Sequence, residues 1–171
     1  MKLKQHIIYG GIVSLCLVPK LGLLSSVFWA SSVLIDVDHY IDFVYRNRFT
    51  SFSIRKMFAC YDIILDWKDK PGFLTLNVFH TIEVIIGVYF MSVWLNSNAI
   101  KTVFWGMVFH MALDIYSMSR KGVLITRAIS FLEYVVRRKL MIWNGLSPNE
   151  ATEEIIIAVN NRFPISKDTS V

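Results

Sequence analysis

Long apolar runs alternate with polar segments along this chain, and they predict its helices. The runs cover residues 6–18, 21–35, 73–95 and 100–118. As helices, the first two would extend about 20 and 22 Å, which is short for a hydrocarbon core about 30 Å thick. The run at 73–95 is long enough to cross such a core. The pattern predicts an all-α, integral membrane bundle of about four helices, with a partly inserted first hairpin as the open alternative.

Short polar breaks join these runs in pairs. Pro19-Lys20 is expected at the tip of a hairpin between the first two helices, and Asn96-Ser97-Asn98 is expected to form the turn between the last two. Connections this short make the paired helices antiparallel neighbours. We therefore predict one transmembrane domain over residues 1–118, which includes a polar cytosolic loop at 45–72 and a turn at 69–72.

Two polar segments carry helical patterns of their own. Within 45–72, apolar residues recur near helical spacing after Ser51 and Ser53, either of which can cap a helix. That helix either lies on the membrane surface or packs on the domain. Residues 119–171 predict a cytosolic tail with an amphipathic helix at about 123–141 and another that starts at Ser147-Pro148. The basic face of the first tail helix consists of Arg127, Arg137, Arg138 and Lys139.

Composition favours a membrane protein. Hydrophobic residues make up 54% of the chain and charged residues only 18%, and the mean hydropathy is +0.48; soluble domains carry about 25% charged residues. We interpret the net charge of +5 as basic segments near anionic lipid, and expect no nucleic-acid partner. Basic residues cluster on the predicted face of the amino terminus, the 45–72 loop and the tail. This bias predicts a multi-pass protein of the inner (plasma) membrane with both termini in the cytoplasm.

A cleaved secretory signal peptide is the alternative explanation of the amino-terminal run, with small residues near Ala30 as the cleavage site. Cleavage there would discard His6 and leave an acidic cluster at the new terminus. We therefore interpret the run as retained.

Ionisable residues gather at one predicted depth. The stretch Asp36-Val37-Asp38-His39 follows the second run, and His6 begins the first. His80 and His110 each lie about 10–12 Å from the same end of their runs, at 1.5 Å per residue. Asp114 follows His110 by four residues, so the two share a helical face. All four predicted helices thus bring a polar group to the cytoplasmic half of the bundle.

Such a cluster in apolar surroundings requires a cation or bound protons. Each pair alone has a structural explanation, such as a neutral hydrogen-bonded pair between helices, but the convergence favours a metal site. Cys16 and Cys60 lack metal-binding spacing. A thiolate-free site suits Zn²⁺ or Mn²⁺, as one ion or as two bridged by an aspartate. The predicted metal ligands are His6, Asp36, Asp38, His39, His80, His110 and Asp114.

Two further roles follow from the residue types. Glu83 or Asp38, where it does not bind metal, is a candidate catalytic general base. Arg46, Arg48 and Lys56 lie close to the acidic stretch in sequence and are candidates for binding a substrate phosphate.

These motifs, in this order, resemble the YdjM-type family of inner-membrane metal-dependent hydrolases. The resemblance rests on His6, Asp36-Val37-Asp38-His39, His80 and His110-Met111-Ala112-Leu113-Asp114, and it covers about residues 4–118. It implies a hydrolase whose metal site is built from those residues. A looser similarity to zinc phospholipase C sites favours a phosphoester substrate.

The sequence thus predicts a membrane-bound, metal-dependent hydrolase that acts on a phosphoester of a lipid or lipid-linked substrate at the cytoplasmic leaflet. The first alternative is a cation or proton permease with an intramembrane relay of His and Asp residues. A relay would place ionisable groups near the midplane and beyond, whereas here they stop at one depth. The second alternative is a structural or regulatory membrane protein whose basic tail binds partners.

Overall fold

The computed structural model describes residues 3–66, 72–122 and 126–163. Within these ranges the regular secondary structure is helical apart from two strands of two residues each, which confirms the all-α class. In chain order, the elements are α1 (Leu3–Leu21), α2 (Leu24–Leu34), α3 (Val37–Arg46), α4 (Ile54–Asp66), β1 (Thr75–Leu76), the 3₁₀ helix η1 (Val78–His80), α5 (Ile82–Trp94), α6 (Asn98–Lys121), β2 (Arg127–Ala128), α7 (Phe131–Trp143) and α8 (Pro148–Arg162).

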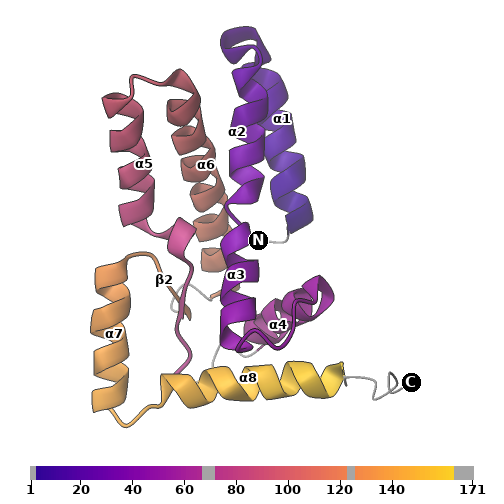
Figure 1. Ribbon diagram of the computed structural model, residues 1–171, viewed down its shortest axis with the longest axis vertical. Helices are drawn as coiled ribbons and strands as arrows, with labels where there is room; N and C mark the ends of the chain where they lie inside the picture. Colours follow the sequence, from indigo (N-terminus) through magenta and orange to yellow (C-terminus); the bar gives the residue numbers. More distant parts are fainter. Residues whose placement is uncertain (1–2, 67–71, 123–125, 164–171) are drawn as a thin grey trace.

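The helices form an upper bundle and a lower layer (Figure 1). In the bundle, α2 packs between α1 and α6, and α5 packs on the other side of α6. Below it, α3 continues downward from α2, and α4 and α8 pack together. The strands β1 and β2 pair in parallel, with Thr75 opposite Arg127 and Leu76 opposite Ala128. The chain therefore passes between the two layers at α2–α3, at β1–η1 and at β2.

Glycine allows α2 to approach both of its neighbours closely. A Cβ atom on Gly10 of α1 would lie 2.5 Å from the hydroxyl oxygen of Ser32, and a Cβ atom on Gly106 of α6 would lie 2.7 Å from the carbonyl oxygen of Phe28. A side chain at either position would clash with α2. Serine hydroxyls in this region donate to backbone carbonyls, as Ser14 does to Ser25 at 2.7 Å. These contacts fix α1, α2 and α6 against one another.

The hairpin between α1 and α2 turns later than the sequence predicted. Pro19 lies inside α1, which runs on to Leu21. The turn is made at Gly22, whose φ of +54° lies in the left-handed region that glycine readily adopts. The second turn agrees with the prediction, because Ser97 caps α6 through a hydrogen bond from the N–H of Ile100.

The apolar run at 73–95 is not one helix, contrary to the prediction. Residues 73–81 contain β1 and η1 with irregular residues around them, and α5 begins only at Ile82. Pairing with β2 holds Thr75 and Leu76 in an extended conformation, and Thr81 is also extended (φ −89°, ψ 145°). The bundle helices α1, α2, α5 and α6 are present, but among the described residues no helix combines the length and apolar composition needed to cross a membrane.

A hydrophobic core holds the lower layer together. It unites α3, α4 and α8 through the buried residues Phe43, Val44, Met57, Cys60, Ile63, Phe73, Ile155 and Val159. Of the two alternatives for the 45–72 loop, the helix α4 packs on the domain, and the N–H of Lys56 donates to Ser53 near its start. Most of the expected turn at 69–72 lies outside the described residues. The predicted domain division at residue 118 is crossed by this core, because α8 belongs to it.

The amphipathic helix expected at 123–141 begins later. Helix α7 starts at Phe131, and residues 123–125 lie outside the described ranges. Ser130 caps it, accepting hydrogen bonds from the N–H groups of Leu132 and Glu133. Arg127 is therefore not on a helical basic face but in β2, where it is buried. The start of α8 at Pro148 agrees with the prediction.

Replacing Gly106 with alanine tests the close packing of α6 on α2. We expect Gly106→Ala to lower the free energy of unfolding by about 1–3 kcal/mol, because the new methyl group meets backbone that must move. Gly87→Ala is the matched control: nothing lies within 4 Å of a Cβ atom there. It should raise the stability by about 0.5–1 kcal/mol through helix propensity. Chemical denaturation followed by circular dichroism measures both, and equal effects would contradict the packing.

Candidate metal centre

Six of the predicted ligands meet where the bundle rests on the lower layer. His6 comes from α1, Asp36 from the junction of α2 and α3, and His39 from α3. The other three are His80 at the end of η1, and His110 and Asp114 on one face of α6. The side chains of His6, His80, His110 and Asp114 are almost completely buried. The agreement in depth that the sequence suggested thus corresponds to a single cluster.

The carboxylate of Asp36 is the centre of this cluster. Its Oδ1 lies 3.3 Å from Nε2 of His39, 3.5 Å from Nε2 of His80 and 3.4 Å from Nε2 of His110. The Nε2 atoms of His80 and His110 are themselves 3.0 Å apart. Four ligand-type atoms therefore face one another from α3, η1, α6 and the α2–α3 junction.

The three distances from Asp36 Oδ1 to the imidazole nitrogens match those around a bound ion, whereas the two Nε2 atoms of His80 and His110 lie slightly closer together. In a tetrahedral site with bonds of about 2.0–2.1 Å, neighbouring ligand atoms lie about 3.3–3.4 Å apart. Three residue triplets each offer ligand atoms that lie within 4.8 Å of one another inside the triplet, and two of the triplets share Asp36. These triplets are His6, Asp36 and His110; Asp36, His39 and His80; and His80, His110 and Asp114. The described residues thus include buried His and Asp groups within metal-binding distance, and a shared Asp36 suits either one ion or two.

Hydrogen bonds on the outer side of the rings orient two histidines inward. Nδ1 of His80 lies 2.9 Å from Oδ2 of Asp38, and Nδ1 of His110 lies 2.7 Å from the carbonyl oxygen of Ser32. A carboxylate or carbonyl accepts a hydrogen bond from Nδ1–H, so Nε2 is the ring atom that faces the cluster and can offer its lone pair to a metal. The same Asp38 oxygen accepts the N–H of Phe79 at 2.9 Å. Asp38 thus holds the outer nitrogen of His80, whereas the sequence predicted it to be a metal ligand.

His39 is held from the lower layer. The side-chain amide of Asn77 lies 2.7 Å from its Nδ1, and the ring of Tyr61 packs edge-on against it at 4.5 Å. The hydroxyl of Tyr61 donates to the carbonyl oxygen of His39 at 3.3 Å. Burial raises the pKa of Tyr61 well above its usual value. The phenol therefore stays protonated and remains a donor.

The electrostatics of Asp36 favour a charged carboxylate. Burial alone would raise its pKa, but hydrogen bonds from His110, His39 and His80 hold the pKa below its usual range. An ionised carboxylate surrounded by imidazole nitrogens is the state required of a metal ligand.

His6 and Asp114 extend the cluster toward β2. Nε2 of His6 lies 3.1 Å from Oδ1 of Asp114, and its ring stacks on that of His110 at 3.8 Å. Nδ1 of His6 and Oδ1 of Asp38 are buried without a hydrogen-bond partner among the described residues. Buried polar atoms of this kind indicate an absent partner such as an ion or water. The donor set and these open atoms together fit a divalent metal.

Arg127 is a member of the site that sequence reasoning missed. Its Nη1 donates to Oδ2 of Asp114 at 2.8 Å, and its side chain is 6% exposed. The amphipathic pattern at 123–141 predicted Arg127 on the basic face of a helix. A capping pattern in the sequence argues against that helix. Ser130 is followed three residues later by Glu133, and this pattern starts a helix after Arg127.

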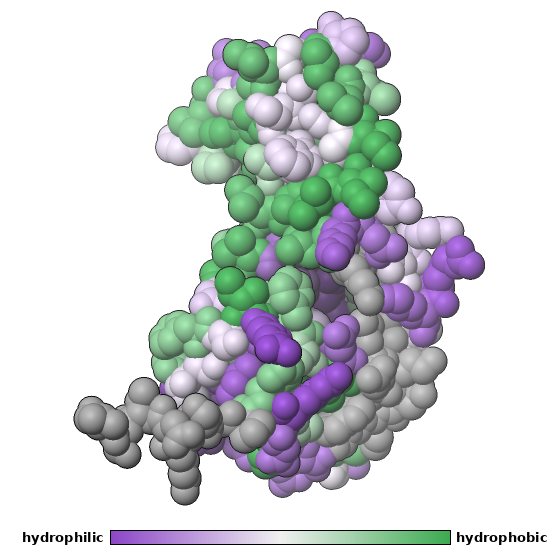
Figure 2. All heavy atoms as spheres, turned by 90° about the vertical axis from the view of Figure 1, so that its right-hand side faces the viewer, coloured by the Kyte–Doolittle hydropathy of each residue, from purple (hydrophilic) through white to green (hydrophobic). Residues whose placement is uncertain are grey.

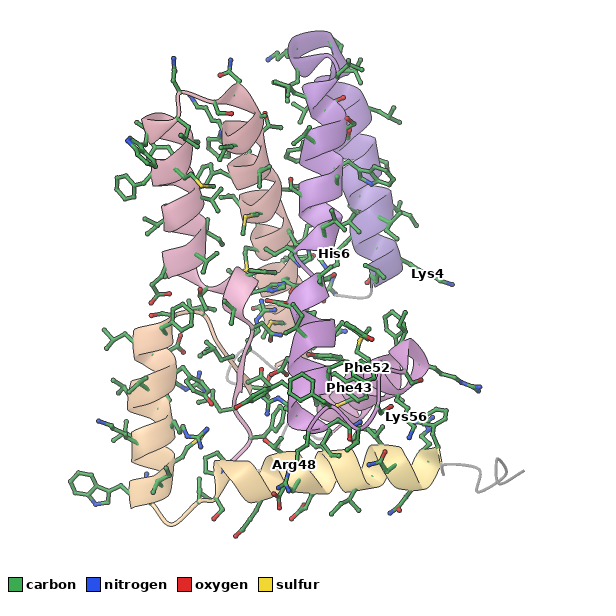
Figure 3. All side chains as sticks on the ribbon, in the orientation of Figure 1. Lys4, His6, Phe43, Arg48, Phe52 and Lys56 are labelled. Carbon is green, nitrogen blue, oxygen red and sulfur yellow. The ribbon has the colours of Figure 1, made fainter. Side chains whose placement is uncertain are left out.

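The residues proposed for phosphate binding lie elsewhere. Arg46 donates to Asp42 and Thr152, Arg48 to Glu153, and Lys56 to Asn160. Figure 3 shows Arg48 and Lys56 beside α8, below His6. The structure brings none of the three to the cluster and instead uses them to hold α8 against α3 and α4.

Glu83 also has a structural contact. Its Oε1 accepts hydrogen bonds from the hydroxyl of Ser130 and the N–H of Phe131, so it joins the start of α5 to the start of α7. Its side chain is exposed, and none of its described contacts is with the cluster. A catalytic role for Glu83 stays a prediction.

Comparison of this chain with protein-family models, with curated proteins and with solved structures found no match.

Asp38→Asn tests whether the outer hydrogen bonds support a metal ligand. We expect Zn²⁺ affinity to fall by about 10–100-fold, because the neutral amide makes His80 less basic and orients it less firmly. Competition with a chromophoric chelator measures the affinity. The matched control is Asp62→Asn, an exposed carboxylate on α4. Equal affinities for the two variants would contradict this role for Asp38.

Proposed function

We propose that this protein is a membrane-bound, metal-dependent hydrolase that acts on a phosphoester of a lipid or lipid-linked substrate. The observation that carries the proposal is the convergence of three imidazole Nε2 atoms on Oδ1 of Asp36, at 3.3–3.5 Å, in a buried cluster. Nitrogen and carboxylate ligands without thiolates suit Zn²⁺ or Mn²⁺. The proposal is consistent with the family resemblance carried by His6, Asp36–His39, His80 and His110–Asp114.

The proposed ligands are His6, Asp36, His39, His80, His110 and Asp114. When bound there, a divalent ion supplies Lewis-acid chemistry: it polarises a phosphoryl oxygen and makes water a stronger acid. The chain's own residues hold the ligand atoms in place and orient them. Asp38 and the Ser32 carbonyl direct two imidazoles inward, Asp36 carries the negative charge between them, and the buried walls of the cluster exclude bulk water.

The surface of the bundle supports a membrane location. Figure 2 shows hydrophobic side chains over the bundle on one face of the molecule, with the most hydrophilic ones mainly below it. Large apolar side chains of the bundle are widely exposed, among them Leu15, Leu23, Phe90, Trp94 and Trp105. A soluble monomer rarely exposes a contiguous apolar area of this kind. Contact with lipid would bury it and would place the cluster near the membrane surface.

The permease alternative requires ionisable groups beyond the cluster. Among the described residues of the bundle above His110, the buried polar side chains are hydroxyl groups: Ser14, Ser25, Ser92 and Thr102. Hydroxyl groups alone make a poor proton relay, because relays through membranes are built from Asp, Glu and His. The arrangement therefore favours the hydrolase.

Metal content and hydrolysis test the proposal together. We expect the purified protein to retain one or two equivalents of Zn or Mn by elemental analysis and to hydrolyse a phosphoester substrate in mixed micelles. Asp36→Asn should lose the metal and reduce hydrolysis to background, because it removes the charge that the three imidazoles share. Asp62→Asn is the matched control and should retain both properties.

A wild-type protein that takes up neither metal after reconstitution, with its helical circular dichroism intact, would sink the proposal. Metal binding without hydrolysis of any phosphomonoester or phosphodiester would reject the phosphoester substrate while leaving the metal site.

A further inference from the structure

The guanidinium of Arg127 is only partly used. Its Nη1 donates to Asp114 at 2.8 Å, but Nε and Nη2 are buried and have no hydrogen-bond partner among the described residues. The side chain is 6% exposed, so bulk water does not replace the missing acceptors. A buried charged group with unused donors is unfavourable unless a ligand supplies the acceptors.

The unused atoms form one edge of the group. Nε–H and Nη2–H point in nearly parallel directions, and this edge matches two oxygens of a phosphate or carboxylate. Asp114 occupies only Nη1, on another side of the guanidinium. Arg127 can therefore hold Asp114 and bind a second anion at the same time.

The backbone fixes this edge in place. Arg127 lies in β2, paired with Thr75 of β1, and the hydroxyl of Thr75 donates to the carbonyl oxygen of Thr126 at 3.2 Å. Two residues after Thr75, Asn77 contacts His39, and His80 follows in η1. The same short segment therefore positions both the arginine and two of the imidazoles.

We propose that Arg127 binds the phosphoryl group of the substrate, with its Nε/Nη2 edge donating to two non-bridging oxygens. The inference rests on the proposed hydrolase function and names the residue that recognises its substrate class. Arg127 stands beside the cluster through Asp114, whereas Arg46, Arg48 and Lys56 donate to groups of the lower layer. A phosphate held by this edge lies next to the ligands that would hold the metal.

Inorganic phosphate is the probe for the test. We expect Arg127→Lys to weaken phosphate binding to the Zn-loaded full-length protein by about 10–100-fold, measured by isothermal titration, because lysine keeps the positive charge but loses the two-pronged edge. Metal content and circular dichroism should stay at wild-type values. The matched control is Arg120→Lys, an exposed arginine of α6 whose Nη1 donates to Tyr116 at 3.3 Å, and it should not change phosphate affinity.

Two results would overturn the inference. Wild-type phosphate affinity in Arg127→Lys with metal retained would show that the edge binds no phosphate. Loss of metal in that variant, with phosphate affinity falling only in proportion to the lost metal, would show that Arg127 merely positions Asp114.

Metal is measured before phosphate is added, so that the two proposals fail separately. If the wild-type protein holds no metal, the hydrolase proposal fails. Phosphate titration of the metal-free wild type and Arg127→Lys then still decides the role of Arg127: a weaker variant supports it, and equal affinities overturn it.

A second measurement needs no variant, in case Arg127→Lys does not fold. Phenylglyoxal modifies arginine, and peptide mass spectrometry reports each site. Phosphate should slow modification at Arg127 at least about 10-fold more than at Arg120, since the bound anion covers Nη2, one of the two terminal nitrogens with which phenylglyoxal reacts. Equal protection at both sites would overturn the inference.

Discussion

The structure depends on a negative charge held among imidazoles and largely shielded from water. Asp36 lies at the point where α2 gives way to α3, and its Oδ1 is shared by nitrogens of His39, His80 and His110. Placing such a group between apolar helices is unfavourable unless every partner is held in position. Four separate segments of the chain must therefore meet at one point, and this requirement fixes how the bundle rests on the lower layer.

The break in the apolar run at 73–95 follows from the same requirement. A continuous helix would use the N–H of Phe79 within its own backbone. In the structure this N–H instead donates to Asp38, the carboxylate that also supports His80. The extended residues before it pair with β2, which satisfies their backbone and carries Arg127 to Asp114. Local irregularity here provides contacts that a regular helix could not.

Helical periodicity explains which parts of the site could be predicted. His110 and Asp114 are four residues apart, and Asp36 and His39 three, so each pair shares a face in any helix. The distance of each residue from the end of its apolar run then predicted a common depth. Arg46 shows the limit of this reasoning: it follows Asp36 by ten residues, about 15 Å along α3, and so ends up against Asp42 and α8. Arg46 is therefore close to Asp36 in sequence but distant from it in the structure. Arg127 reaches the site only through strand pairing, which periodicity does not reveal.

The position of the cluster bears on what kind of substrate suits it. The bundle above it exposes apolar side chains such as Leu15 and Phe90, while the layer below carries ion pairs such as Arg46 with Asp42 and Arg48 with Glu153. A phospholipid has the same polarity along its length, with apolar chains on one side of its phosphoester and a polar head group on the other. If the bundle contacts lipid as proposed, the phosphoester and the metal ligands lie at similar depth. The substrate would then reach the cluster by lateral diffusion, without taking its acyl chains into water, which is unfavourable by about 0.8 kcal/mol per methylene group.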